Sequence, residues 1–384
     1  MAKYLYIGLV GLALLEAARV YFIMPMPGSQ QWNSLELAYL IHSYRWAGRA
    51  IFGGLILLGA KQAFASSYWI AGIATLLVLV IVYLFNFKMK ADRMFIEPID
   101  LSFSGLGNSP LSDSTLVIAV VEAGETKAYP IRYIAYHHQV RDQIDGKEIM
   151  VTYCSVCRTG RVFEPRVDGK LETFRLVGMD HFNAMFEDSR TGSWWQQANG
   201  EAIVGPSKGS QLPELVSYQL TLGKFFELHP QGKVMDPDPS FLSKYDSLGK
   251  FEFGKSKSKL TGTDSSSWKE KSWILGIKLP GVSKAYDWND LKSSGTIHDE
   301  VQGQAVFLVL SEDQNSFKAF LRHDASQSIE RLPGDLLLVG SDTLDFQGKD
   351  IRTKNPVLFP IFAYQEFWHS WRTFNPQTEI YSPN

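Results

Sequence analysis

The chain has 384 residues, enough for two or three domains, and its 38 basic and 40 acidic side chains leave a formal charge of −2. A chain this close to neutral lacks the basic footprint of a nucleic-acid-binding protein, so we expect no nucleic-acid partner. Two cysteines exclude a disulfide framework, and the fold must therefore rest on apolar packing.

Residues 1–91 have the composition of a membrane anchor with about three transmembrane helices. Residues 4–24 are about one bilayer thickness of helix, and residues 68–87 are uncharged and long enough to span. Residues 35–60 are apolar but carry charges, and we interpret them as a third span. The first segment is too long and too charged for a signal-peptide core, so we expect it to be retained. The lipid bilayer is therefore a predicted partner.

Charged residues within these segments are expected to have partners, because an unpaired charge in a membrane is costly. We predict that Glu16, Arg19 and Arg45 pair across the first two helices. More basic residues lie on the side of the large C-terminal region than on the other side, and the positive-inside rule would place that region in the cytoplasm.

From about residue 92 onward the chain reads as a soluble, β-rich region of the α+β type. Short runs of β-forming residues alternate with turn signals, and helical periodicity is weak. The sequence "VDGK" between two such runs predicts a hairpin turn.

This region contains an internal repeat. Three blocks align in the same order at shifts of 157, 162 and 146 residues, and the longest places residues 124–163 on 281–320 without a gap. Such an order predicts two tandem diverged repeats, at about 110–240 and 272–384. The joint at 254–272 is rich in Lys and Ser, and we expect a mobile loop there.

The two copies serve as an internal control. Asp142, Asp180, Asp188 and Arg190 keep counterparts in the second copy, which favours structural roles for them. Four side chains capable of redox or metal chemistry are lost together, as follows: Cys154 becomes Ser311, Cys157 becomes Gln314, His137 becomes Ser294 and His181 becomes Thr343.

The stretch "VTYCSVCRTG" predicts a strand, a tight turn and a returning strand. Two cysteines on such a knuckle form half of a sulfur-ligand metal site, for which zinc or copper is suited. A thioredoxin-type pair instead begins a helix, and Gly160 and Pro165 oppose a helix here. The pattern favours one metal ion held by Cys154, Cys157 and His137, with His181 as a further candidate ligand. A disulfide or two unbonded thiols remain alternatives.

Trp194 and Trp195 lie in a loop between two glycines and have no counterpart in the second copy. They are candidates to line a cofactor or partner pocket. The structural alternative is that they fill the core.

Three stretches together resemble the DUF3179 family of uncharacterised proteins: residues 136–164 with the cysteines, residues 186–205 with "SWWQQANG", and "LHPQGKV". The resemblance covers about residues 95–240 closely and the second repeat loosely, and the N-terminal membrane segment lies outside it. Ser155 and Val156 replace the usual Pro-Leu, and Arg158 replaces a Gly. The residues that carry over are His137, Asp142, Tyr153, Cys154, Cys157, Asp188, Ser193, Trp195, Gly200 and Gly205.

The resemblance implies no established reaction. Many relatives look exported, which implies a bacterial inner-membrane protein whose soluble region is periplasmic. The distribution of basic residues beside the helices favours the opposite placement, in the cytoplasm.

We therefore predict a membrane anchor at 1–91, a first repeat with the CxxC at 92–250 and a degenerate second repeat at 272–384. The predicted function is that of a membrane-anchored metal-binding protein. Two alternatives are a thiol–disulfide oxidoreductase and an accessory subunit of a membrane protein complex. In the latter, the charged helices and the aromatic segment at 359–374 would contact other membrane-protein subunits.

Overall fold

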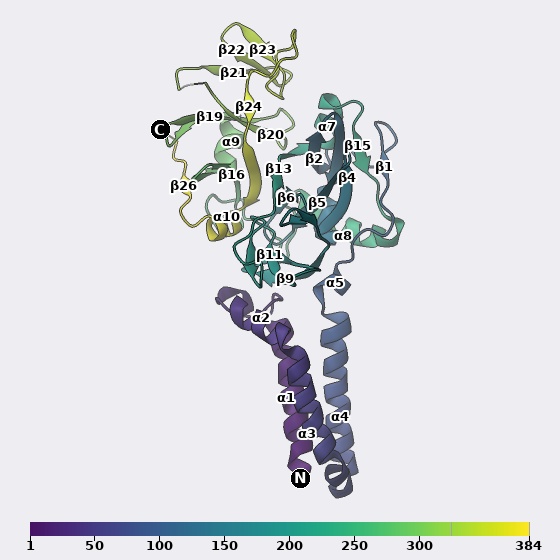
Figure 1. Ribbon diagram of the computed structural model, residues 1–384. Helices are drawn as coiled ribbons and strands as arrows, with labels where there is room; N and C mark the ends of the chain where they lie inside the picture. The colour runs from purple at the N-terminus through teal and green to yellow at the C-terminus, as the bar shows by residue number, and fades with distance from the viewer. Residues whose placement is uncertain (324, 384) are drawn as a thin grey trace. The chain divides into compact units, whose positions relative to one another are not determined.

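A computed structural model describes residues 1–323 and 325–383 (Figure 1). The chain divides into two compact units. The first unit comprises residues 1–96, 170–196 and 201–211, and the second comprises 97–169, 197–200 and the chain from 212 onward. The N-terminal helices therefore share a unit with a segment from the middle of the β-rich region.

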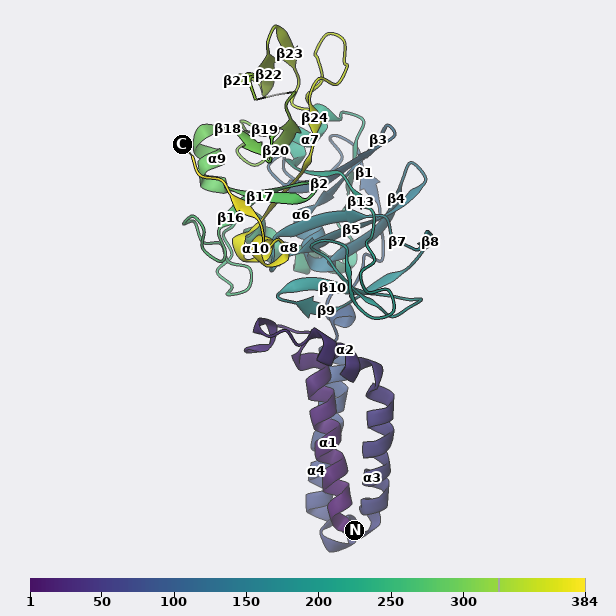
Figure 2. The same cartoon turned by 60° about the vertical axis from the view of Figure 1, so that its left-hand side comes forward.

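Long helices that lie side by side make up most of the first unit (Figures 1 and 2). They are α1 (Ala2–Tyr21), α2 (Leu35–Ser43), α3 (Arg45–Ser66), α4 (Tyr68–Tyr83) and α5 (Ala91–Met94), with the short turns η1 (Ser29–Gln31) and η2 (Leu84–Lys88). Among the described residues, two helices are long and apolar enough to cross a membrane, α1 and the continuous helix Tyr68–Lys88. The predicted third span is divided at Tyr44 into α2 and α3, and α3 is less apolar because it carries Arg45, Arg49 and Lys61.

Glycine allows α1 and α3 to approach closely. A Cβ atom at Gly59 would lie 2.1 Å from the Leu5 backbone nitrogen, and one at Gly8 would lie 2.7 Å from the Phe52 carbonyl oxygen. Small residues at such contacts are typical of helices that pack in membranes. The apolar core of the three helices consists of Leu5, Leu9, Ala63, Ala71 and Val78.

One buried carboxylate links the three long helices. Glu16 is fully buried and accepts hydrogen bonds from Arg49 Nε at 2.6 Å and Asn86 Nδ2 at 2.9 Å, and from Arg19 in its own helix. The predicted pairing of Glu16 with Arg19 is confirmed, but Arg49 takes the place predicted for Arg45. Arg45 donates to the backbone carbonyl of His42 instead. It is the first residue of α3, and Arg49, four residues further along that helix, is the one that lies level with Glu16.

The first unit also contains a four-stranded antiparallel sheet of order β12-β11-β10-β9. Its strands are β9 (Phe174–Asp180), β10 (Asn183–Asp188), β11 (Trp194–Gln196) and β12 (Ala202–Val204), preceded by β8 (Lys170–Leu171). The helical segment contacts this sheet where Met179 N donates to Ile23 O at 2.8 Å and where His42 Nε2 lies 3.2 Å from Glu187. Burial alone would raise the pKa of Glu187, but His42, Arg175 and Trp194 lower it to about 2.

The second unit has two halves. The first half contains β1 (Phe103–Ser104), β2 (Leu116–Glu122), β3 (Glu125–Pro130), α6 (Ile131–His137), β4 (Gln139–Ile144), β5 (Lys147–Cys154), β6 (Thr159–Phe163), β7 (Arg166–Val167), β13 (Glu214–Leu215), β14 (Ser217–Thr221), α7 (Leu222–Leu228), β15 (Lys233–Met235), η3 (Pro239–Phe241) and α8 (Leu242–Glu252). The second half contains β16 (Trp273–Leu279), β17 (Val282–Asp287), α9 (Trp288–Ser294), β18 (Thr296–Val301), β19 (Gln304–Leu310), β20 (Phe317–Leu321), β21 (Ile329–Leu332), β22 (Leu336–Val339), β23 (Asp342–Leu344), β24 (Phe359–Pro360), β25 (Phe362–Phe367), α10 (Trp368–Phe374) and β26 (Glu379–Ile380).

The sheets of the two halves run in matching order. Strands β14-β2-β3-β15 lie in one sheet and β25-β16-β17-β26 in another, and in each the last pair is parallel and the others antiparallel. Adding 157 to the bounds of β2, β3, α6 and β4 reproduces those of β16, β17, α9 and β18. Two further four-stranded sheets have the orders β13-β6-β5-β4 and β18-β19-β20-β24, and a three-stranded sheet has the order β21-β22-β23.

One acidic side chain occupies the same place in both halves. Asp142 Oδ2 accepts from Tyr129 Oη at 2.7 Å and from Lys127 Nζ at 3.0 Å. Asp299 Oδ2 accepts from Tyr286 Oη at 2.9 Å and from Lys284 Nζ at 2.7 Å. The structural role predicted for Asp142 therefore agrees with its contacts.

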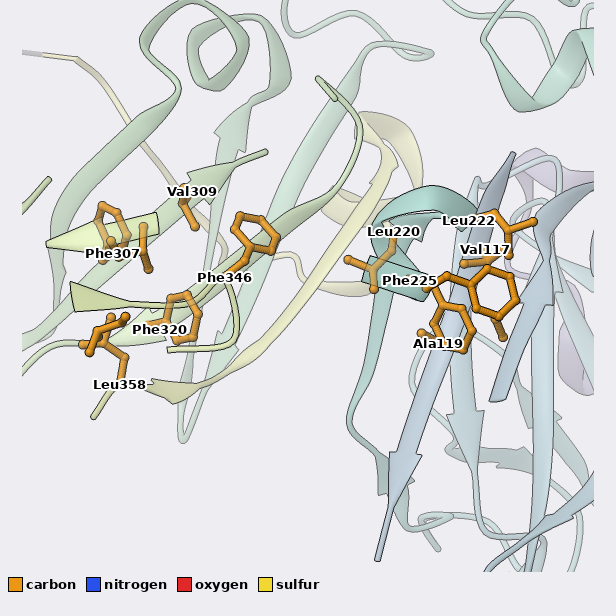
Figure 3. Packing of buried hydrophobic residues seen from close by; sticks show 14 of the residues in the cluster. Val117, Ala119, Leu220, Leu222, Phe225, Phe307, Val309, Phe320, Phe346 and Leu358 are labelled. Carbon is orange, nitrogen blue, oxygen red and sulfur yellow. The ribbon is translucent and has the colours of Figure 1, made fainter. Parts of the chain in front are cut away.

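A shared apolar core joins the halves of the second unit. It takes Val117, Leu220 and Phe225 from the first half and Phe307, Phe320 and Leu358 from the second (Figure 3). Burial of such side chains contributes about 1.5–3 kcal/mol each. The two halves therefore fold against one another within this unit.

A buried ion pair also crosses between the halves. Arg161 and Glu366 are each about 1% exposed and are hydrogen bonded to each other. The Arg161 guanidinium also donates to the Ala198 carbonyl at 3.1 Å and lies 3.4 Å from the centroid of the Tyr364 ring. Arg161 Nε also lies 3.4 Å from Glu214 Oε1.

We predict that Arg161→Met lowers the free energy of unfolding by about 3–5 kcal/mol, because it leaves the Glu366 carboxylate buried without its cation. Chemical denaturation of the detergent-purified chain would measure it. The matched control is Arg352→Met, since Arg352 pairs with Asp342 and both are largely exposed; its effect should stay below about 1 kcal/mol. Equal effects of the two substitutions would contradict the prediction.

Candidate functional site

Both cysteines lie at the end of one β-hairpin. Strands β5 and β6 pair antiparallel, with Cys154 opposite Thr159. Cys154 is the last residue of β5, and Cys157 lies in the turn that leads to β6. The strand, turn and returning strand predicted from the sequence are present, and Cys157 does not begin a helix.

The turn closes with an unusual residue. Arg158 has φ +56°, a left-handed conformation that favours glycine and costs other residues about 1 kcal/mol or more. Its guanidinium lies 3.7 Å from the centroid of the Trp273 ring and donates to Gln365 Oε1 at 2.8 Å and to the Glu252 carbonyl at 2.9 Å. These buried contacts offset the strain, so an arginine can stand where the resemblance leads us to expect glycine.

The two thiols are neighbours in a closed environment. Cys154 and Cys157 are each fully buried, and their side chains are hydrogen bonded to one another. Cys157 also has a hydrogen bond with the side chain of Ser370, and its backbone carbonyl accepts from Phe367 N at 3.0 Å. The second half thus packs directly on the cysteine turn.

Lys271, from the joint between the halves, and His369, from the second half, complete this site. Lys271 Nζ donates to the Val156 carbonyl at 2.6 Å and to the Leu260 carbonyl at 2.6 Å. It also lies 3.1 Å from His369 Nε2, which is 3.2 Å from the same Val156 carbonyl. The joint between the halves, predicted as a mobile loop, therefore places an ammonium group beside the turn that carries both thiols.

Burial dominates the protonation of these groups. It raises the pKa of Cys157 well above that of an ordinary thiol, and the neighbouring Cys154 adds to the shift, whereas Ser370 and Lys271 oppose it. Burial lowers the pKa of Lys271, and the negative charge that the cysteines can carry opposes that shift. Burial and the Lys271 charge lower the pKa of His369 to about 3, so His369 is neutral. At neutral pH Cys157 is thus a thiol and His369 a neutral imidazole.

The model of a family described as a protein of unknown function, DUF3179, matches residues 102–378, most of the chain. The chain belongs to the DUF3179 family. No curated protein and no solved structure matches it. The match includes both halves of the second unit, and helices α1 to α5 lie outside it.

The histidines predicted as ligands of this DUF3179 protein make contacts with other side chains. His137 Nε2 is 2.6 Å from Tyr245 Oη, in an aromatic cluster with Phe241. His181 belongs to the first unit, where its Nδ1 lies 2.9 Å from Asp180 Oδ1. Within residues 1–323 and 325–383, no group of three or more His, Cys, Asp or Glu side chains is arranged to hold a metal ion.

Trp194 and Trp195 fill the core of the first unit. Both are at most 1% exposed. Trp194 Nε1 donates to Glu187 and Trp195 Nε1 donates to Asp188, each at 2.9 Å. These contacts match the structural alternative stated for the pair, and a cofactor role for them stays a prediction.

Sequence reasoning did not identify Lys271, His369 or Ser370 as site residues. His369 and Ser370 belong to the aromatic segment 359–374, which was predicted as a partner surface in one alternative. Phe367 and Trp371 in this segment are fully buried in the second unit, so they do not form such a surface. The one feature of the sequence that could have pointed to the site is His369, a histidine within the aromatic segment 359–374 of the half that lacks cysteines.

We predict that alkylation of the native thiols is slow at neutral pH and keeps accelerating above about pH 9, because the raised pKa of Cys157 holds it as a thiol. Lys271→Met should shift the pH profile of the alkylation rate upward, since it removes the cation that stabilises the thiolate. The exposed Lys269 supplies the control Lys269→Met, which should leave the profile unchanged. A profile unmoved by Lys271→Met would contradict an electrostatic role for this lysine.

Proposed function

We propose that this DUF3179 protein is a membrane-anchored thiol protein in which Cys154 and Cys157 form a redox-active pair. The observation that carries the proposal is the hydrogen-bonded pair of thiols beside the ammonium group of Lys271 and the imidazole of His369. A cation beside a thiol favours the thiolate, which is the nucleophile in disulfide exchange.

The proposed reaction is a two-electron exchange with an acceptor disulfide. One thiolate attacks a sulfur of the acceptor and releases the first acceptor thiol. The second thiolate then attacks the mixed disulfide, forms the bond between Cys154 Sγ and Cys157 Sγ and releases the second acceptor thiol. The two protons lost by the cysteines are gained by the two acceptor thiols, and the two electrons go with them.

Two buried residues suit roles in this exchange. Lys271 stabilises the thiolate, whose formation burial otherwise opposes. His369 Nε2 lies 3.1 Å from Lys271 Nζ and 3.2 Å from the Val156 carbonyl, so the imidazole helps to position the ammonium group beside the cysteine turn. Both thiols are buried, and the acceptor therefore has to reach them by displacement of the covering segment around residues 260–271.

The two halves of the second unit support a further part of this proposal, a tandem duplication. Their sheets share one order of strands, and element bounds repeat at the shift of 157 residues read from the sequence. On this proposal the second copy lost both cysteines but supplies His369 and Ser370, and the joint before it supplies Lys271. The second copy is therefore a working part of the site rather than a degenerate scaffold.

We expect the wild-type chain to exchange one dithiol for one disulfide in a glutathione redox buffer, because the sulfurs are already within hydrogen-bonding reach. Intact-mass and thiol counts at equilibrium would measure this. Cys154→Ser and Cys157→Ser should each abolish the internal disulfide and leave a mixed disulfide with glutathione. A wild-type pair that stays fully reduced across oxidising buffers would contradict the proposal.

A second candidate function uses the same pair as ligands for zinc or copper. The specific observation in its favour is the hairpin turn that brings both sulfurs together, since thiolates bind these metals. Elemental analysis of the reduced protein separates the candidates. About one equivalent of metal, absent from the Cys154→Ser, Cys157→Ser variant, would favour the metal candidate and contradict the redox one.

The helices of the first unit support the proposed membrane anchor with three crossings. Glu16 near the end of α1 contacts Asn86 beyond α4, and the two helices run in the same direction (Figure 2). If both cross the bilayer, the chain between them must return across it. Helix α3 has 22 residues, about 33 Å, which is enough for that return.

We predict that the chain remains in the membrane fraction at high salt and alkaline pH and is released by detergent, because its contact with lipid is apolar. A C-terminal alkaline phosphatase fusion should be active, which corresponds to the periplasmic placement predicted from the sequence. Release by salt alone would overturn the anchor. An inactive phosphatase fusion together with an active cytoplasmic reporter would place the second unit in the cytoplasm, as the basic residues beside the helices favour.

A further inference from the structure

We propose that the helical bundle carries a binding pocket for the phosphate headgroup of an anionic phospholipid. The pocket has a volume of about 580 Å³ and lies wholly within the first unit. This volume is in the range of small-molecule sites. The inference rests on the proposed membrane anchor and is independent of the thiol chemistry.

Cations from three parts of the chain converge on this pocket. They are Arg19 of α1, Arg45 and Arg49 of α3, and Lys90 and Arg93 after η2. Glu16 offsets one positive charge and Asp92 offsets a second, so five cations against two carboxylates leave a net charge of about +3. Among the described residues, Arg45 and Arg93 make no ion pair, and Arg45 donates to the His42 carbonyl. Guanidinium groups suit phosphate because they can donate two parallel hydrogen bonds.

The rest of the lining is apolar and aromatic, as an acyl chain requires. Trp46 and Phe87 line the pocket and are 66% and 58% exposed. Tryptophan is enriched where the hydrocarbon of a bilayer meets its headgroups. The pocket thus combines cationic side chains with exposed aromatic ones, as the headgroup and upper acyl chain of a phospholipid require.

Two of the arginines that line the pocket, Arg19 and Arg49, are held in place by hydrogen bonds. Arg49 Nη2 donates to Asn86 Oδ1 at 2.6 Å, and Arg19 Nη1 donates to the same oxygen at 3.1 Å. Both arginines pair with the buried Glu16. Two guanidinium groups are therefore fixed before a ligand arrives, which reduces the entropy lost on binding. Basic pockets between membrane helices are suited to anionic headgroups for these reasons.

The test compares two variants that lose the same charge. Arg45→Gln with Arg93→Gln removes two pocket cations and leaves the Glu16 network intact. Lys3→Gln with Lys61→Gln removes two exposed cations at the other end of the helices (Figure 2). Native mass spectrometry of the full chain in detergent would measure the binding of phosphatidylglycerol, phosphatidylcholine and inorganic phosphate.

We expect phosphatidylglycerol to bind in preference to phosphatidylcholine, and the pocket variant to bind it about 30-fold more weakly, at roughly tenfold or less per cation. The control variant should bind like wild type. Equal loss in both variants, no preference for the anionic lipid, or inorganic phosphate binding as tightly as the lipid would each overturn the proposal. Recovery of the chain in the membrane fraction distinguishes failure of the pocket from failure of the anchor itself.

Discussion

The buried contact between Arg161 and Glu366 is the constraint on which the candidate site depends. It holds the β5–β6 hairpin of the first half against β25 and α10 of the second. Two further contacts join the same hairpin to β25: Arg158 donates to Gln365, and Phe367 N donates to the Cys157 carbonyl. Two arginines in the low-polarity interior are tolerated only because each is hydrogen bonded and packed against an aromatic ring. The cysteine turn therefore has one position relative to the second half, and Lys271 and His369 are brought to it.

Much of the fold could be predicted because it follows from local pattern. The shift of 157 residues read from the sequence reproduces the bounds of several strands and one helix, since segments with a similar hydrophobic period and similar turn residues form similar elements. The CxxC hairpin could be predicted because a strand precedes the cysteines and because Gly160 and Pro165 oppose a helix after them. The break at Tyr44 was missed because a run of apolar residues does not reveal where a helix changes direction.

The partners of the thiols could not be predicted, because the sequence does not state which loops of two copies meet. His137 is 17 residues before Cys154, yet its ring turns to Tyr245, more than a hundred residues later. Alignment of the two halves directed attention to side chains that the first half alone carries. Lys271 and His369 fall on Ser114 and Gly223 at shifts of 157 and 146 residues, so that comparison could not identify them as site residues.

The division of the site between separate parts of the chain has a physical rationale. A thiolate buried at this depth is unfavourable unless a cation lies beside it. The first half provides the thiols, and the joint before the second half provides Lys271, whose charge opposes the effect of burial on the pKa of Cys157. Because Lys271 donates to the carbonyl of Val156, which lies between the two cysteines, the protonation of Cys157 depends on how the joint packs against the β5–β6 turn.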